Sequence, residues 1–401
     1  MSAAAPAPDR RAIVLVIDAC GAGALPDAGD YGDEGTNTLA HLAEAVGGLQ
    51  LPTLGELGLG SILPLHGVPA VEDPAIHGRL HPLGPGKDSV SGHWELMGVV
   101  LERAQPTYPA GFPPQVIERL VHAMGHEVIG NRPYNGIAAV QELGAEHLRT
   151  GALILYTSQD SVLQLAAHVD RVSPRELYEA CAAARAAMTG EHAVGRVIAR
   201  PFTGVEGAFE RTDGRRDFAL APPSRSYLQE LSDAGVEVHG IGKIADLFAG
   251  VGVGASHPGA SNAQALASVT GVLGELRHGL VFANLVETDQ RYGHRKDVHG
   301  FAAALAEIDA YVRRLLATMA EGDLLVLSAD HGVDPAHRGS DHTREYAPLL
   351  AVTGEMARRR RDGGRLGGAR HDGPLADVGA SALRWLIGRD ADVLPGSAFI
   401  S

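Results

Sequence analysis

The sequence LLVLSADHG runs from residue 324 to residue 332. Its apolar first half is typical of a buried strand, and Asp330 and His331 follow where that strand should end. A carboxylate and an imidazole side by side are uncommon in a core, but together they suit a borderline divalent ion such as zinc or manganese. Another histidine, His342, follows soon after. The stretch therefore predicts a strand that delivers metal ligands at its C-terminal end.

Two other apolar runs end in the same way. Residues 12–17 precede Asp18, and residues 280–285 precede Asp289 and His294, whose spacing suggests a turn with Gly293 at the bend. Ligands of open α/β sheets collect outside the carboxyl ends of the strands. A single aspartate after a strand is more often a turn former, and the chain has 19 histidines. Three such strand ends together nevertheless favour one metal site.

Strands and helices alternate regularly in the second half of the chain. We expect helices from about residue 226, over 263–276 and over 301–319, each followed by a strand, at 236–239, 280–285 and 324–327. This alternation predicts an α/β fold with a mostly parallel sheet sandwiched by helices. Residues 50–86 are expected to be loop-rich. The run Arg358 to Arg361 is expected to be a solvated loop without a role.

The middle of the chain contains further elements. Residues 153–156 and 196–199 are expected to be strands. Ser173 should cap a helix that has Pro174 at its first position and Glu176 three residues after the cap. Gly190 is the expected end of that helix.

Composition excludes several classes of protein. Hydrophobic residues make up 45% and charged residues 20% of the 401 residues, which predicts a substantial core. The net charge of −14 argues against binding to a nucleic-acid backbone, and no apolar run is long enough to span a membrane. Two cysteines cannot form a disulfide framework. Residues 1–10 lack a signal-peptide core and should form a flexible extension, so we expect a cytoplasmic protein.

A nucleophile is expected in the segment KDSVSGHWE at residues 87–95. A serine hydroxyl is a weak nucleophile unless a base or a metal activates it. No local base motif accompanies this segment, so metal activation is the natural route. Chemistry alone leaves both Ser89 and Ser91 as candidates.

Seven stretches of the chain resemble the phosphopentomutase family of the alkaline phosphatase superfamily. They are the strand ending in Asp18, GKDSVSGHWE at 86–95, YTSQDSV at 156–162, GRVIARPF at 195–202, GKIAD at 242–246, YGHR at 292–295, and SADHG through SDHTRE at 328–345. They span nearly the whole chain, so the resemblance does not depend on a single motif.

The resemblance implies two manganese ions. Asp18, Ser89, Asp330 and His331 would hold one ion, and Asp289, His294 and His342 would hold the other. Ser89 matches the residue that carries the phosphate, where many members have threonine with the same hydroxyl. The resemblance also implies an alkaline-phosphatase-like core formed by residues 1–103 and 221–401, and an inserted α/β cap domain at 104–220. The residues implied to meet the sugar phosphate are Asp160, Arg196, Ile198, Arg211 and Lys243.

The implied activity is the interconversion of ribose 1-phosphate, or its 2-deoxy form, with ribose 5-phosphate. It would proceed through a phosphoserine enzyme and a 1,5-bisphosphate, with glucose 1,6-bisphosphate or a similar bisphosphate as activator, and would link nucleoside breakdown to pentose phosphate metabolism. The resemblance also favours a monomer.

Other functions are also compatible with the sequence. A metal-dependent phosphatase or a phosphoglycerate mutase of the same superfamily would share the metal pattern. A non-catalytic relative is disfavoured because every expected ligand is present. A sulfatase would need a C-x-P-x-R motif, and CAAAR at 181–185 lacks the proline.

Overall fold

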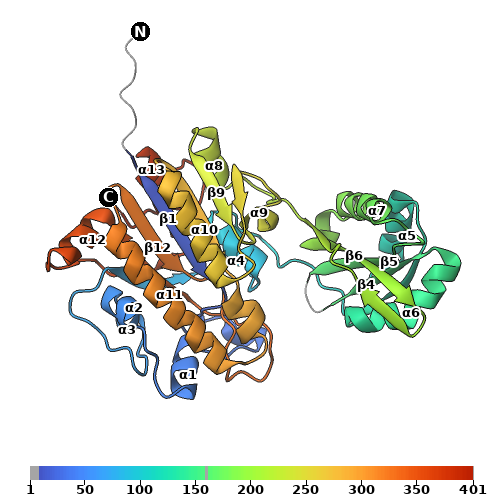
Figure 1. The fold of residues 1–401 in the computed structure, drawn as a ribbon, viewed down its shortest axis with the longest axis horizontal. Helices are drawn as coiled ribbons and strands as arrows, with labels where there is room; N and C mark the ends of the chain where they lie inside the picture. Colours follow the sequence, from blue (N-terminus) through green and yellow to red (C-terminus); the bar gives the residue numbers. More distant parts are fainter. Residues whose placement is uncertain (1–8, 159–160, 401) are drawn as a thin grey trace, which may run out of the picture. The chain divides into compact units, whose positions relative to one another are not determined.

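The computed structural model describes residues 9–158 and 161–400. The chain divides into two compact units, which are described separately. Unit 1 consists of the chain up to Arg103 and from Pro222 onward, and unit 2 is Ala104–Ala221. Figure 1 shows that a single insertion interrupts unit 1.

Unit 1 is built on a mixed sheet of eight described strands. Their order is β10 (Ala255–His257), β9 (Glu237–Ile241), β11 (Gly279–Leu285), β1 (Arg11–Ile17), β12 (Asp323–Ser328), β13 (Ala347–Thr353), β2 (Ile76–His81) and β14 (Gly373–Pro374). The first five strands are parallel, whereas β13 runs antiparallel to both of its neighbours. The strands β11, β1 and β12 are almost completely buried, which explains their continuous apolar sequences.

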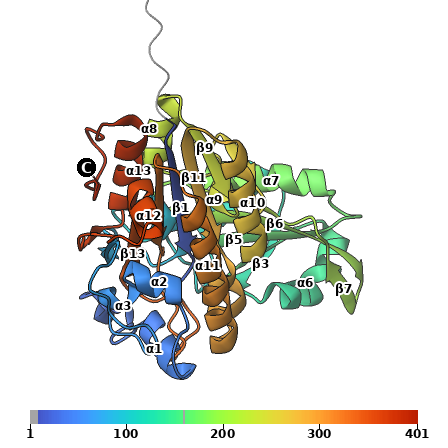
Figure 2. The same cartoon turned by 60° about the vertical axis from the view of Figure 1, so that its left-hand side comes forward.

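Helices cover both faces of this sheet (Figures 1 and 2). The longer ones, α10 (Asn262–Glu275) and α11 (Val298–Thr318), lie on one face, and α4 (Ser89–Leu96), α8 (Tyr227–Asp233) and α13 (Asp377–Ile387) lie on the other. The remaining helices of unit 1 are α1 (Thr38–Ala45), α2 (Pro52–Leu57), α3 (Leu59–Ile62), α9 (Ile244–Leu247) and α12 (Gly354–Arg361), with a 3-10 turn at Ala28–Tyr31. The predicted α/β class is therefore confirmed.

One local prediction for unit 1 was wrong. The arginine run is not a loop but the last half of α12, which Thr353 caps. Arg359 pairs with Glu355, and Arg358 with Asp362, each four residues apart along the chain, while Arg360 pairs with Glu56 at 2.6 Å. Such pairs offset the repulsion between neighbouring arginines. The segment 50–86 is loop-rich as expected, although it also contains α2, α3 and β2.

Unit 2 is a smaller α/β sandwich. Its sheet has the order β3 (Val128–Pro133), β4 (Leu153–Thr157), β5 (Val162–His168), β6 (Arg196–Val205) and β7 (Ala208–Arg211), and β8 (Arg216–Ala219) also pairs with β6. The helices α5 (Pro114–Met124) and α7 (Pro174–Ala187) cover one face, and α6 (Gly136–Thr150) covers part of the other. Ser173 caps α7 as predicted, but the helix ends at Ala187 and Gly190 begins a separate 3-10 turn.

The first described residues make side-chain contacts with the rest of unit 1. Residues 1–8 of the expected flexible extension lie outside the described residues. Asp9 pairs with Arg277 at 2.8 Å, and Arg10 donates a hydrogen bond to the carbonyl of Trp385. No helix among the described residues combines the length and the apolar character needed to cross a membrane.

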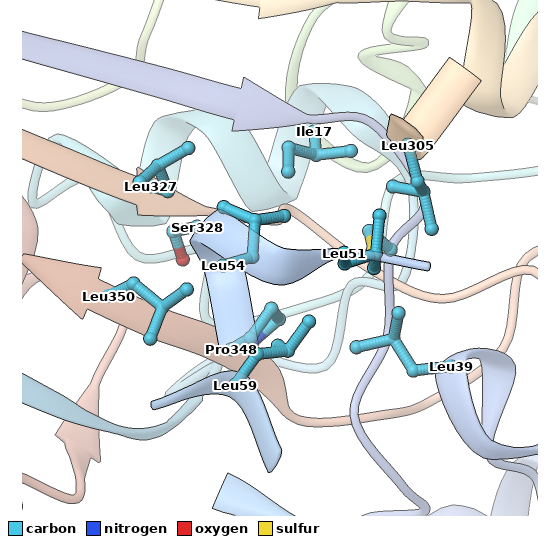
Figure 3. A pocket seen from close by; sticks show the side chains of 11 residues that line it. Ile17, Leu39, Leu51, Leu54, Leu59, Leu305, Leu327, Ser328, Pro348 and Leu350 are labelled. Atoms are coloured by element: carbon cyan, nitrogen blue, oxygen red, sulfur yellow. The ribbon is translucent and has the colours of Figure 1, made fainter. Parts of the chain in front are cut away.

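A small apolar cavity lies inside unit 1, between the sheet and the helices α2, α3 and α11 (Figure 3). Ile17, Leu54, Leu305 and Leu350 are among its lining residues, and the Ser328 hydroxyl is one of its few polar groups. Its volume of about 20 Å³ is close to that of one water molecule. The cavity is a packing defect and is too small for an organic ligand.

Candidate metal centre

Three neighbouring parallel strands deliver the predicted ligands to one edge of the unit 1 sheet. Strand β1 lies between β11 and β12. Asp18 directly follows β1, and Asp330 follows β12 after one residue. Asp289 lies just beyond β11, in a π-helical turn at Thr288–Gly293. Asp289 and His294 are therefore joined by a turn, as predicted, and this turn is a wide helical one that ends at Gly293.

The first ligand group consists of Asp18, Asp330 and His331, whose ligand atoms lie within 4.8 Å of one another. Nε2 of His331 is 3.5 Å from Oδ1 of Asp18 and 3.3 Å from Oδ2 of Asp330. All three side chains are buried. Two carboxylates so close together, out of water, need a cation between them.

The second group shares His331 and adds Asp289 and His342. Nε2 of His342 lies 3.5 Å from Oδ1 of Asp289, and Nε2 of His294 lies 3.2 Å from the same oxygen. The two Nε2 atoms of His294 and His342 are 3.2 Å apart. Imidazole nitrogens and a carboxylate oxygen thus face a common point, as ligands of a divalent ion do.

The electrostatics show strong coupling within this centre. Burial, and then the charge of Asp330, raise the pKa of Asp18 to about 8. Burial lowers the pKa of His331 to about 4. Burial alone would raise the pKa of Asp289, but its close contact with the His342 imidazole lowers this pKa to about 2, and the same contact raises the pKa of His342 to about 9. These shifts show that the carboxylates and imidazoles of the two groups interact closely with one another.

The hydrogen bonding of the three carboxylates also supports a metal site. One buried oxygen of each carboxylate has no hydrogen-bond partner among the described residues: Oδ1 of Asp18, Oδ1 of Asp289 and Oδ2 of Asp330. Buried polar atoms are almost always hydrogen-bonded. Three exceptions at one point indicate a missing ligand of positive charge, and oxygen with imidazole nitrogen suits manganese or zinc.

Ser89 is the first residue of α4 and lies at this centre. Its hydroxyl is 3.1 Å from Nε2 of His331. Asp88 caps the helix by accepting hydrogen bonds from the backbone N–H groups of Val90 and Ser91. The Ser91 hydroxyl instead donates a hydrogen bond to the Asp88 carboxylate at 2.8 Å. Of the two candidate serines, Ser89 is therefore the one that faces the ligands.

Comparisons with known proteins agree with this arrangement. Residues 10–388 match the family model described as Metalloenzyme superfamily. The chain is 46% identical to the phosphopentomutase of Carboxydothermus hydrogenoformans, over 85% of this chain and 88% of that protein. It is 47% identical to the phosphopentomutase of Dictyoglomus turgidum, over 87% and 89% of the two chains. The identity to the phosphopentomutase of an Anaeromyxobacter strain is 45%, over 98% and 99%.

The chain belongs to the phosphopentomutase family. The likeness to solved structures is weaker. The structure of Leishmania mexicana phosphoglycerate mutase is 12% identical, covers 98% of both chains and has a TM-score of 0.47. The predicted family membership is thus confirmed.

Two buried residues near the metal centre of this phosphopentomutase-family protein were missed in the sequence. Nδ1 of His93 donates to the carbonyl of Ser89 at 2.8 Å and lies 3.1 Å from Oδ2 of Asp330. The Asn284 amide donates both to Nε2 of His93 and to Oδ2 of Asp18. The pair therefore connects the serine backbone to two carboxylate ligands. The spacing of Ser89 and His93, four residues apart in one helix, was the available signal.

Glycine allows α4 to approach the ligands. A Cβ atom on Gly92 would lie 2.4 Å from the carbonyl oxygen of Asp330. Because that neighbour is backbone, it could not move aside easily. The helix that carries Ser89 therefore packs directly against the strand end that carries Asp330.

A second missed network joins the segment before Ser89 to the segment that carries His342. The Arg344 guanidinium binds the Asp27 carboxylate and donates to the carbonyl of Gly86 at 2.7 Å. Oδ2 of Asp33 accepts from the backbone N–H of Arg344 and from Lys87. The sequence offered no signal for these long-range contacts.

The residues that the family resemblance implies for binding the sugar phosphate belong to both units of the chain. Lys243, in unit 1, lies 3.6 Å from Oδ2 of Asp18. Arg196, Ile198 and Arg211 are on strands β6 and β7 of unit 2. Asp160 lies outside the described residues.

Proposed function

We propose that this protein is a phosphopentomutase, which interconverts α-D-ribose 1-phosphate, or 2-deoxyribose 1-phosphate, with D-ribose 5-phosphate. Relatives of that name share about 45% of its sequence over most of both chains. The observation that carries the proposal is the Ser89 hydroxyl, 3.1 Å from His331 within a set of buried carboxylates and imidazoles. The reaction would connect nucleoside breakdown with pentose phosphate metabolism.

The two ligand groups support the metal-binding residues that the family resemblance implies, which also include Ser89 and His294. Asp18, Ser89, Asp330 and His331 hold one ion, and Asp289, His294 and His342 hold the other. We propose Mn²⁺ for both, since mixed oxygen and imidazole donors suit it. Such ions lower the proton affinity of a hydroxyl and neutralise the charge of a transferring phosphoryl group.

The protein side chains position the phosphoryl group and its acceptor. Ser89 carries a phosphate and transfers it to the free hydroxyl of the pentose phosphate, which gives a 1,5-bisphosphate. The other phosphate then returns to Ser89, so the reaction balances without net hydrolysis. His93 fixes the Ser89 backbone by its hydrogen bond to the carbonyl. Lys243 supplies positive charge beside Asp18.

Unit 2 is, in this proposal, the cap domain, and Arg196, Ile198 and Arg211, together with Asp160, recognise the sugar phosphate. Arginine is suited to this task because its planar guanidinium binds phosphate oxygens in pairs. Activation by glucose 1,6-bisphosphate or a similar bisphosphate, the cytoplasmic location and the monomeric state stay predictions.

The test follows ribose 5-phosphate by phosphorus NMR with purified protein, Mn²⁺ and a trace of glucose 1,6-bisphosphate. A ribose 1-phosphate signal without inorganic phosphate is the expected result. Stoichiometric release of inorganic phosphate would instead identify a phosphatase with the same metal centre. No change at all would contradict both activities on this substrate.

A further inference from the structure

One face of the unit 2 sheet carries polar side chains from four adjacent strands. Tyr156 on β4 pairs with Gln164 on β5, Gln164 pairs with Ile198 on β6, and Ile198 pairs with Asp217 on β8. Directly paired residues point to the same face of a sheet. Arg200, two residues after Ile198, shares that face. This set of five residues is called the polar face below.

Helix α6 packs on the same sheet surface as the polar face. Ala139 and Val140 of α6 pack on Ile154, Ala166 and Phe202, which form the apolar part of the same sheet surface. The helix begins at Gly136. A Cβ atom on Gly136 would lie 1.7 Å from Nη2 of Arg211 and 2.6 Å from the Tyr156 hydroxyl. The Arg211 guanidinium and the Tyr156 hydroxyl therefore meet at the first turn of α6.

Positive charge is concentrated at this place. Nε of Arg200 donates to the neutral amide oxygen of Gln164 at 3.2 Å. Burial, followed by the nearby charges of Arg215 and Arg211, lowers the pKa of Arg200. Gln164, which accepts this hydrogen bond, pairs in the sheet with Tyr156, whose hydroxyl lies beside the Arg211 guanidinium. The Asp217 carboxylate accepts two hydrogen bonds from Arg215, both at 2.7 Å, and lies 3.8 Å from Arg196.

A buried hydroxyl beside these arginines also lacks a partner. Tyr156 is fully buried, and its hydroxyl makes no hydrogen bond with good geometry to any described residue. A buried hydroxyl without a partner costs about 1–3 kcal/mol. Guanidinium groups, an unsatisfied hydroxyl and the N-terminus of a four-turn helix all favour an anion with several oxygens.

We infer that Arg200 and Tyr156, together with Arg211, bind a phosphomonoester dianion on the polar face of unit 2. The inference rests on the proposed function and deepens it. The ligand is the phosphate of the pentose phosphate that is not being transferred, and Arg200 and Tyr156 are additional to the residues that the family resemblance implies.

The test compares Arg200→Met with Arg216→Met in the full-length protein. Arg216 lies on β8 and pairs with Ala199, so it belongs to the opposite face, where its guanidinium packs on Tyr178 and Phe218. Both variants lose one arginine from the same unit. Binding of ribose 5-phosphate is measured by calorimetry with Mn²⁺ and without a bisphosphate activator, and circular dichroism checks folding.

Arg200→Met should weaken binding about 10- to 100-fold, as expected for one charged hydrogen-bonding group. Arg200→Lys should fall between this variant and the wild type, because lysine keeps the charge but loses the planar fork. Tyr156→Phe should weaken binding about 3- to 10-fold. Arg216→Met should bind like the wild type. In turnover, the Arg200 variants should raise KM more than they lower kcat.

Two results separate this inference from the proposed function. If the wild type interconverts the pentose phosphates but Arg200→Met binds and turns over like Arg216→Met, the polar face is not the phosphate site and the mutase assignment stands. If the wild type shows no interconversion while inorganic phosphate binds in a manner that depends on Arg200, the anion site stands and the mutase assignment is wrong.

Discussion

The hydroxyl oxygen of Ser89 lies 3.1 Å from Nε2 of His331, although the two residues are separated by 242 positions in the chain. The contact exists because α4 begins at Ser89 and packs, through Gly92, against the backbone of Asp330. His331 in turn belongs to both ligand groups. The candidate nucleophile is thus placed at the point that the two groups share.

Replacement of Ser89 by alanine should abolish phosphorylation of the protein while manganese binding persists. We expect activity to fall about 1,000-fold or more, because loss of a nucleophile removes the covalent route. Intact-protein mass spectrometry after incubation with glucose 1,6-bisphosphate measures the phosphoprotein. The control is Ser91→Ala, which removes a capping hydroxyl and should cost about 1 kcal/mol of stability without loss of phosphorylation. Full activity of Ser89→Ala would refute the assignment.

Replacement of His93 by glutamine should weaken manganese binding about 10- to 100-fold, as do other changes to residues that orient metal ligands. The reason is its contact with Asp330 and, through Asn284, with Asp18. Electron paramagnetic resonance of free Mn²⁺ gives the affinity. His147→Gln is a matched control, since His147 is equally buried but lies in unit 2, where its ring is hydrogen-bonded to Ala152. Both variants should lose stability. Equal manganese affinity in the two would show that His93 is only a packing residue.

A methyl group at Gly92 should displace α4 from the strand end. The added Cβ would meet the Asp330 carbonyl at 2.4 Å, so Gly92→Ala should cost about 1–3 kcal/mol, as overpacking does, and should lower activity at least tenfold. Gly271→Ala in α10 is the control, because nothing lies within 4 Å of the added atom and alanine favours a helix by up to about 1 kcal/mol. Urea unfolding and mutase assays compare them, and similar behaviour of the two variants would contradict the packing argument.

Glu95 should make stability depend on pH. Burial raises the pKa of Glu95 from near 4.5 to about 7, although its carboxylate accepts hydrogen bonds from the N–H groups of Leu83 and Gly84. Between these values the folded protein holds a proton that the unfolded chain lacks, so the free energy of unfolding falls as pH rises from about 4.5 to 7. One proton contributes a slope of at most about 1.4 kcal/mol per pH unit.

The comparison for this prediction is Glu95→Gln, whose side chain does not titrate. Urea unfolding at half-unit steps of pH should give a shallower decline for the variant than for the wild type across that window. Parallel curves would mean that folding does not raise the pKa of Glu95.

The local sequence was enough to predict the α/β class and the candidate ligands. Asp18, Asp289 and Asp330 each follow a short apolar run, and adjacent parallel strands bring their C-terminal ends to one edge whatever the intervening loops do. The matched motifs added the expected roles, and the family they indicated was confirmed. The errors were local. The arginine run was predicted to be a loop, but its ion pairs with Glu56, Glu355 and Asp362 accompany a helix.

What the sequence by itself determined was therefore the set of chemical groups and their position at strand ends, because the apolar runs that form strands are encoded locally. Tertiary structure alone decided which groups touch. The contact of His93 with Asp330 and the convergence of Arg200, Arg211 and Tyr156 join residues that are distant in the chain. Such contacts depend on how whole helices and strands pack, since no local pattern specifies which buried polar atom will face which partner.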